Sequence, residues 1–179
     1  MARFFLLFYV AMIGATLALQ LAFDRVVSDL WVSRPPSSLP TDVLVGVSIG
    51  LAFVVATQWA GRHLRAFRDM AAALGELLQF MSPKDVPAQA FSSALAEELL
   101  FRGFLQPLLG LHGTAILFGL VHGVRDRRLR WWPPIGVLLG YILGLLFESR
   151  GNLLAPFLVH LTINWFNLHY VLEREPSSP

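Results

Sequence analysis

Residues 94–104 read Ala-Leu-Ala-Glu-Glu-Leu-Leu-Phe-Arg-Gly-Phe and place Glu97, Glu98 and Arg102 inside an otherwise apolar run from Ala88 to Leu109. That run is long enough to cross a bilayer, because its 22 residues span about 33 Å as a helix. An ionised side chain at mid-bilayer costs roughly 2.5–3.5 kcal/mol. Three such groups within six residues therefore indicate a functional role for this segment.

The spacing of the three charged residues predicts one ion pair and one unpaired carboxyl group. Glu98 and Arg102 are four positions apart, so they meet on one helical face and can pair. Glu97 points about 100° away and needs a partner from another helix, or it stays protonated. An unpaired carboxyl group in a membrane interior is a functional-site hypothesis by default.

Two apolar segments downstream offer such partners. Phe118 and His122 form an FxxxH sequence, and His160 and Asn164 form an HxxxN sequence with both side chains on one helical face. The order EExxxR, FxxxH, HxxxN resembles the CAAX-protease and bacteriocin-processing family of intramembrane endopeptidases. The resemblance covers about half of the chain, roughly residues 88–171. Each motif alone is weak, but three in this order on hydrophobic segments are a strong signal.

The chemistry of these residues fits peptide hydrolysis, and the resemblance implies the same roles. Glu97 is the expected general base, because a carboxylate can take a proton from water and return it to the leaving amine. His122 would position that water through a ring nitrogen. His160 and Asn164 would donate hydrogen bonds to the oxyanion formed by the attack.

Supporting roles are expected for three further residues, and a metal ion is an alternative. Glu98 and Arg102 would form a structural pair that orients the first carboxylate, and Phe118 would pack beneath His122. Two histidines and a carboxylate also resemble a catalytic zinc set with an open position, which here would be Glu97, His122 and His160. The helical HExxH arrangement is absent from the sequence. The resemblance favours metal-free glutamate catalysis, without a cofactor.

The composition is that of an integral membrane protein. Of the 179 residues 55% are hydrophobic and 15% are charged, against about 25% charged in soluble domains, and the mean hydropathy is +0.59. Cysteine is absent, which excludes disulfides and thiolate chemistry. A formal charge of +2 is too small to indicate a nucleic-acid partner. The expected partners are the lipid bilayer and a membrane-anchored protein or peptide substrate.

The hydrophobic pattern predicts an all-α, polytopic membrane helix bundle in one domain, 1–179, with about six transmembrane helices and one interfacial helix. Residues 1–61 would hold two spans, and residues 62–87 an amphipathic helix on the membrane surface, Arg62–Met81, followed by a loop. Residues 88–172 would form a four-span catalytic core, and 173–179 a polar tail. The predicted spans are Phe4–Phe23, Val43–Ala60, Ala88–Leu109, Leu111–Val124, Trp131–Phe147 and Leu153–Leu172.

Proline and glycine positions add detail to this bundle. Pro107 is expected to kink or end the third span. Two glycine series at four-residue intervals suggest helix faces that allow close packing. They are Gly46 with Gly50, and Gly136 with Gly140 and Gly144.

The distribution of basic residues predicts the orientation. With six spans, one side of the membrane holds ten lysine and arginine residues and the other holds three, with Arg102 left inside a helix. By the positive-inside rule both termini are then cytoplasmic, and a bacterial inner membrane is the expected location.

The function expected from these observations is intramembrane endopeptidase activity. The bond cut would lie near the membrane-embedded or lipidated C-terminal end of a substrate, in CAAX-type processing, bacteriocin maturation or removal of a C-terminal sorting anchor. The rival hypothesis is a non-enzymatic membrane chaperone or transporter-like subunit that uses the Glu/His network as a proton relay. A transporter often carries internal inverted repeats, and the sequence shows none.

Overall fold

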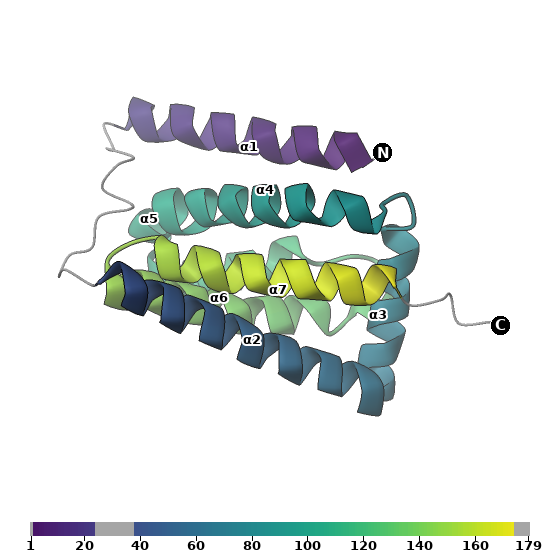
Figure 1. Ribbon diagram of the computed structural model, residues 1–179. Helices are drawn as coiled ribbons and strands as arrows, with labels where there is room; N and C mark the ends of the chain where they lie inside the picture. The colour runs from purple at the N-terminus through teal and green to yellow at the C-terminus, as the bar shows by residue number, and fades with distance from the viewer. Residues whose placement is uncertain (1, 24–37, 174–179) are drawn as a thin grey trace.

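The computed structural model describes residues 2–23 and 38–173, and every regular element in these ranges is a helix (Figure 1). This confirms the all-α class. The tail expected at 173–179 lies, apart from Glu173, outside the described residues. The elements are α1 (Ala2–Ala22), α2 (Leu39–His63), α3 (Arg65–Leu77), η2 (Pro83–Asp85), α4 (Val86–Glu98), the π-helical segment η3 (Leu99–Leu105), α5 (Gln106–Val121), η4 (Arg127–Leu129), α6 (Trp132–Arg150) and α7 (Leu154–Leu172).

Within the described ranges, four helical stretches are long and apolar enough to cross a membrane: Arg3–Ala22, Leu39–His63, Pro83–Val121 and Arg127–Arg150. The chain is therefore an integral membrane protein built as a helix bundle. The count differs from the expected six for two reasons. The sequence of α7 is enriched in histidine and asparagine, and Pro83–Val121 is one nearly continuous helical stretch of 39 residues. The number of six membrane crossings therefore stays a prediction.

This 39-residue stretch reverses direction at Gly110. The rings of Phe101 and Phe118 have centroids 4.9 Å apart, whereas 17 positions of straight helix would separate them by about 25 Å. Gly110 has φ 70° and ψ 173°, a conformation that only glycine adopts readily. The leg after the reversal, residues 111–121, is about 16 Å long, shorter than a bilayer core.

The break at Gly110 lies between the predicted spans Ala88–Leu109 and Leu111–Val124, whereas the expectation that Pro107 would end the third span was wrong. Pro107 sits in the first turn of α5, directly after the π-helical segment η3. There the N–H of Gln106 bonds five residues back, to the carbonyl of Phe101. The helix therefore continues through the proline.

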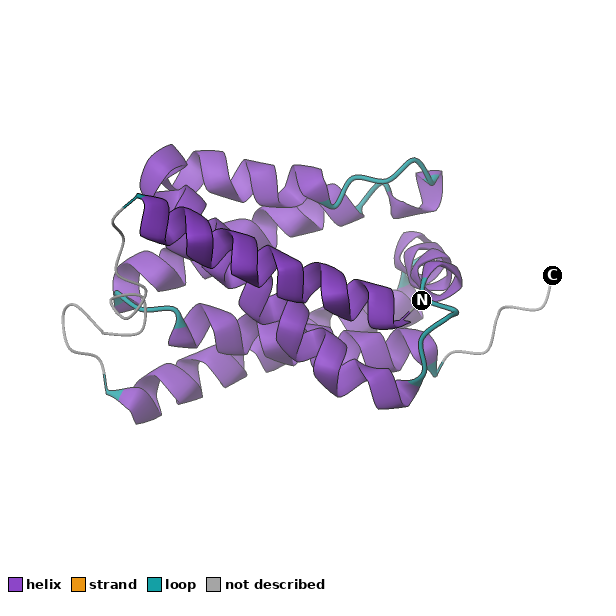
Figure 2. Cartoon of the chain, turned by 90° about the horizontal axis from the view of Figure 1, so that it is seen from above, coloured by secondary structure: helices purple, strands orange, loops and turns teal. Residues whose placement is uncertain are grey.

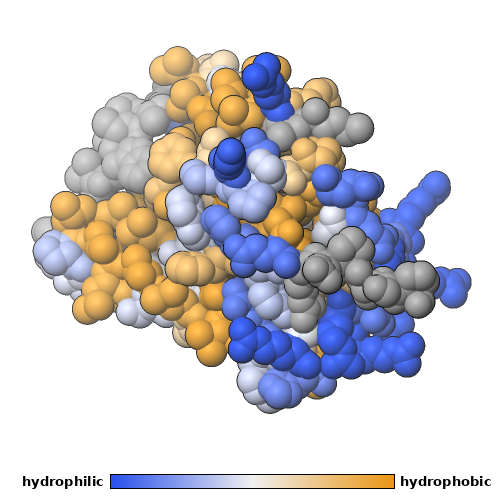
Figure 3. Space-filling model, turned by 45° about the vertical axis from the view of Figure 1, so that its right-hand side comes forward, coloured by the Kyte–Doolittle hydropathy of each residue, from blue (hydrophilic) through white to orange (hydrophobic). Residues whose placement is uncertain are grey.

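Helix α3 is the predicted amphipathic helix, shorter than the expected Arg62–Met81. Leu64 has an extended backbone that separates α3 from α2. In Figure 1, α3 runs across the end of the bundle where α1 begins and α7 ends. Figure 3 shows hydrophilic side chains gathered over much of this end. Arg128 of η4 ties α3 down by bonding both carboxylate oxygens of Glu76, at 2.8 and 2.7 Å.

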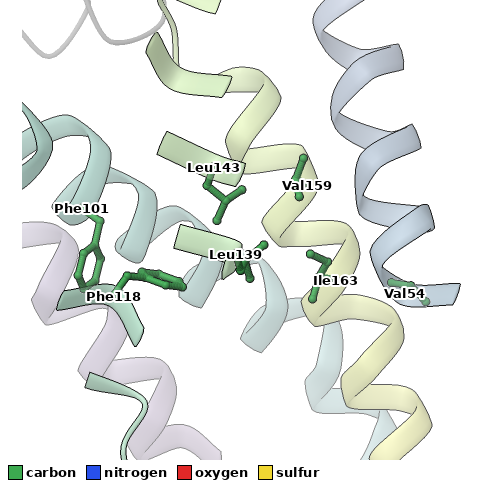
Figure 4. Close-up of a cluster of buried hydrophobic side chains, with 7 residues drawn as sticks. All are labelled: Val54, Phe101, Phe118, Leu139, Leu143, Val159 and Ile163. Atoms are coloured by element: carbon green, nitrogen blue, oxygen red, sulfur yellow. The ribbon is translucent and has the colours of Figure 1, made fainter. Parts of the chain in front are cut away.

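Both glycine faces pack closely, as predicted. A Cβ added at Gly46 or Gly50 would lie within 2.8 Å of α7 atoms, and one added at Gly140 would lie 2.9 Å from the Cα of Ala115 in α5. These contacts bring α2 against α7 and α5 against α6. A hydrophobic cluster fills the space between the helices (Figure 4): Val54, Phe101, Phe118, Leu139, Leu143, Val159 and Ile163. Seen from above, α1 lies at an angle over the rest of the bundle (Figure 2).

Candidate active site

The four predicted catalytic residues line one cavity of about 440 Å³. Glu97 comes from α4, His122 from the end of α5, and His160 with Asn164 from α7. The helices α1, α2, α3 and α6 contribute mostly apolar side chains to the same cavity. The fold thus brings together residues that are up to 67 positions apart in the sequence.

Glu97 faces both histidines without a direct hydrogen bond to either. Its Oε2 atom lies 3.9 Å from Nε2 of His122 and 3.8 Å from Nε2 of His160. These distances exceed those of hydrogen bonds, which end near 3.2 Å. Oε2 is buried and makes no hydrogen bond within the described part of the chain. Within the described residues, no protein donor therefore occupies the lone pairs of this atom.

His122 is held with its Nε2 atom toward the cavity. It ends α5, and its Nδ1 lies 2.6 Å from the carbonyl oxygen of Phe118. A carbonyl only accepts, so Nδ1 carries the proton and donates it, which leaves Nε2 of a neutral ring as an acceptor. The Phe118 ring packs on the imidazole with centroids 4.8 Å apart, as predicted, and Trp132 lies 5.4 Å away.

The expected ion pair between Glu98 and Arg102 is present, with Nη1 to Oε1 at 3.1 Å. The same Oε1 also accepts from Nδ1 of His160 at 2.8 Å. Glu98 was expected to help orient Glu97, but its hydrogen bonds go to Arg102 and His160, because adjacent helical residues point about 100° apart. Glu98 thus fixes the His160 ring, and Nε2 of that ring faces Glu97.

Arg102 is fully buried and joins η3 to α6. Its Nη2 donates to the carbonyl of Gly140 at 3.1 Å, and its guanidinium carbon lies 4.6 Å from the Phe118 ring centroid, a cation–π distance. The π-helical turn that carries Arg102 is a feature often found at functional sites. At the start of this π-helical segment, the side-chain amide of Gln20 in α1 donates to the carbonyl of Leu99 at 3.4 Å.

Asn164 lies one helical turn after His160, and its Nδ2 donates to Oγ of Ser93 at 2.9 Å. The second N–H of this amide remains for the cavity that Asn164 lines. Ser93 and Tyr9 also line the cavity, and sequence reasoning missed both. A signal for Tyr9 exists, because Tyr9, Thr16 and Gln20 are spaced to share one face of α1.

The residues considered for zinc lie farther apart in this arrangement than the ligands of a zinc ion do. Ligands of tetrahedral zinc at 2.0–2.1 Å stand about 3.4 Å apart. Both distances from Glu97 to the histidines exceed this value. In the described ranges, no group of three His, Cys, Asp or Glu side chains is spaced to hold a metal.

Residues 80–166 match the family described as type II CAAX prenyl endopeptidase Rce1-like. The chain is also 30% identical over 145 residues to an uncharacterized protein, YpbD, of Bacillus subtilis (strain 168). That alignment covers 78% of this chain and 72% of YpbD. No solved structure matches significantly.

The matched segment begins just before η2 and ends within α7, so it contains all three motifs. Helices α1, α2 and α3 precede it. The resemblance seen in the motifs, the relative and the helical membrane fold agree with one another. The chain therefore belongs to the Rce1-like family of CAAX prenyl endopeptidases, and its general class is that of a CAAX-type intramembrane protease.

Proposed function

We propose that this protein is a glutamate-dependent intramembrane endopeptidase that cuts near the membrane-embedded or lipidated C-terminal end of its substrate. The observation that carries the proposal is the position of the Glu97 carboxylate. Its buried Oε2 makes no hydrogen bond in the described ranges and faces Nε2 of both histidines across a cavity. A water molecule between these three atoms would have two acceptors, Glu97 and His122, for its protons.

In the proposed reaction, Glu97 takes one proton from that water, and His122 orients it through Nε2. The water oxygen forms a bond to the peptide carbonyl carbon, and the carbonyl oxygen becomes an oxyanion. When the C–N bond breaks, Glu97 returns the proton to the leaving amine. The products are a new carboxylic acid and a new amine, and Glu97 is again ionised; the acid then gives its proton to the amine, which leaves a carboxylate and an ammonium group.

Oxyanion stabilisation would come from His160 and Asn164. Because Nδ1 of His160 bonds the Glu98 carboxylate, Nε2 carries a hydrogen only when the ring holds both protons. Glu98 stabilises that cationic ring. Glu97 and Glu98 then carry two negative charges, and the His160 ring and Arg102 carry two positive charges. This balance limits the free-energy cost of burying the four groups. The free N–H of Asn164 would supply the second donor.

The shape and lining of the cavity bear on the substrate. Its walls are mainly apolar, with contributions from Phe67, Met70 and Leu74 of α3. Such walls suit a lipidated or apolar tail, as in CAAX-type processing, bacteriocin maturation or removal of a sorting anchor. We further propose an inner-membrane location with both termini cytoplasmic, so that substrate enters from the side covered by α3.

The proposal is tested with purified protein in proteoliposomes and a prenylated CAAX peptide that carries a fluorophore and a quencher on either side of the bond. Glu97→Gln should abolish cleavage, whereas the matched control Glu148→Gln should cleave normally, because Glu148 bonds Gln106 and does not line the cavity. Retained cleavage in Glu97→Gln would contradict the proposal.

Two further arms separate the alternatives. Dialysis against a zinc chelator should leave the rate unchanged, and a loss that zinc restores would instead support metal catalysis. A proton relay would show no cleavage by any variant but a proton flux across the vesicle membrane that Glu97→Gln removes.

The direction of access is tested by Val124→Cys, which places the only thiol of the chain on the cavity wall. A charged thiol reagent should label it faster from the cytoplasmic side.

A further inference from the structure

Helix α1 precedes the segment matched to the family, yet it reaches the cavity. Tyr9, near the middle of α1, lines the cavity together with Glu97. The Tyr9 hydroxyl lies near enough to the Glu97 carboxylate for the two groups to interact electrostatically, and the tyrosine side chain is half-buried. A carboxylate only accepts, so the tyrosine is the donor of a hydrogen bond between them.

The contacts of α1 hold Tyr9 in a defined place. Phe5, one turn before it, stacks on Phe80 with centroids 5.1 Å apart. Toward the other end of the helix, Phe23 packs edge-on against Phe104 of η3 at 5.6 Å. Between them Thr16 is buried, and Gln20 donates to the start of η3. The helix is thus anchored on both sides of the tyrosine.

We propose that Tyr9 is a positioning residue for Glu97, an inference that rests on the proposed function. A glutamate side chain on a helix has several rotamers, and fixing one costs entropy. In this proposal, a hydrogen bond from the Tyr9 hydroxyl selects the Glu97 rotamer in which Oε2 lies 3.8 and 3.9 Å from the Nε2 atoms of the two histidine rings. Helix α1 therefore completes the active site from outside the segment that carries the motifs.

A spectroscopic test does not depend on a substrate. The carboxyl stretching band of Glu97 is identified by infrared spectroscopy as the band that Glu97→Gln removes. Tyr9→Phe keeps the ring and deletes the hydroxyl, so it should shift that band. The matched control is Tyr141→Phe, which deletes a hydroxyl bonded to His112 at 3.0 Å outside the cavity and should leave the band in place. An unchanged band in Tyr9→Phe would overturn the proposal.

A kinetic test uses the same variants with the quenched peptide. Tyr9→Phe should lower kcat about tenfold, the effect of one hydrogen bond to a charged group, with KM unchanged. Tyr141→Phe should match the wild type. Activity in Glu97→Gln would refute the proposed function itself. If Glu97→Gln is inactive while Tyr9→Phe equals Tyr141→Phe in both band and kcat, the role of Tyr9 alone is refuted.

Discussion

Two buried polar clusters in this bundle differ in how completely they are bonded. In the first, Asp42 of α2 accepts from Nε of Arg150 at 2.5 Å and from Nδ2 of Asn152 at 2.9 Å, so both of its oxygens are bonded. Asn152 also accepts from the backbone N–H of Leu154 at 2.8 Å. In the second, the site cluster, Oε2 of Glu97 and Oε2 of Glu98 are buried without a hydrogen bond in the described ranges.

The difference separates a structural role from a chemical one. Buried polar groups that only join helices are normally satisfied, because an unmade hydrogen bond costs about 1–3 kcal/mol. The Asp42 cluster meets this rule and closes α2 onto the α6–α7 connection. In the site cluster, Glu97 has an unbonded oxygen and lines the cavity, which is the pattern of a group that binds water or substrate. Three predictions test this contrast, and a fourth extends it to an exposed ion pair.

Replacing Glu97 by alanine should have the largest effect, and only on activity. Loss of the general base should lower the rate of peptide cleavage by about 10²–10⁴-fold. The free energy of unfolding in detergent micelles should change by no more than about 0.5 kcal/mol, because no ion of opposite charge is stranded. Severe destabilisation would show that Glu97 is as structural as Asp42.

Replacing Glu98 by alanine should reduce stability. It leaves Arg102 fully buried without its ion-pair partner, which typically costs about 3–5 kcal/mol. Unfolding by SDS titration in mixed micelles measures this cost. Equal protein yield and equal activity loss for the Glu97 and Glu98 variants would contradict the division of roles between them.

Replacing Asp42 by alanine should destabilise the protein by about 3 kcal/mol, since it removes two hydrogen bonds that involve a charged group. The rate per folded molecule should stay at the wild-type value, because this cluster does not line the cavity. The SDS titration measures the loss of stability, and the quenched peptide measures the cleavage rate. A selective loss of kcat in the folded fraction would end the contrast between the two clusters.

The smallest effect is expected at the surface pair that holds α3. The Arg128 guanidinium lowers the pKa of the Glu76 carboxyl below its ordinary 4.5. A lowered folded-state pKa contributes stability that is present above the unfolded value and is lost as pH falls through the folded one. A fluorophore on α3 should therefore report loosening as the pH drops below 4.5, and Glu76→Gln should be loosened already at neutral pH. If Glu76→Gln loosened with falling pH as the wild type does, a group other than Glu76 would cause the response.

Much of the site could be predicted from the sequence, because its signals are local. The pairing of Glu98 with Arg102 follows from helical spacing. Charged residues in apolar runs point to function, since each carries a large insertion cost. The four-residue intervals between glycines indicated the packing faces, because residues four positions apart lie on the same face of a helix. The segment bounds were less accurate, as α3 shows, because a helix ends where backbone conformation changes at single residues such as Leu64.

The sequence by itself determined the membrane class, the helical pattern and the identity of the motif residues, because composition and period carry that information along the chain. Only the tertiary structure decided which nitrogen of His160 meets Glu98 and that Tyr9 of the first helix comes close to Glu97. These contacts join residues up to 88 positions apart. They depend on how the helices rotate and cross, which side-chain packing of the whole bundle sets.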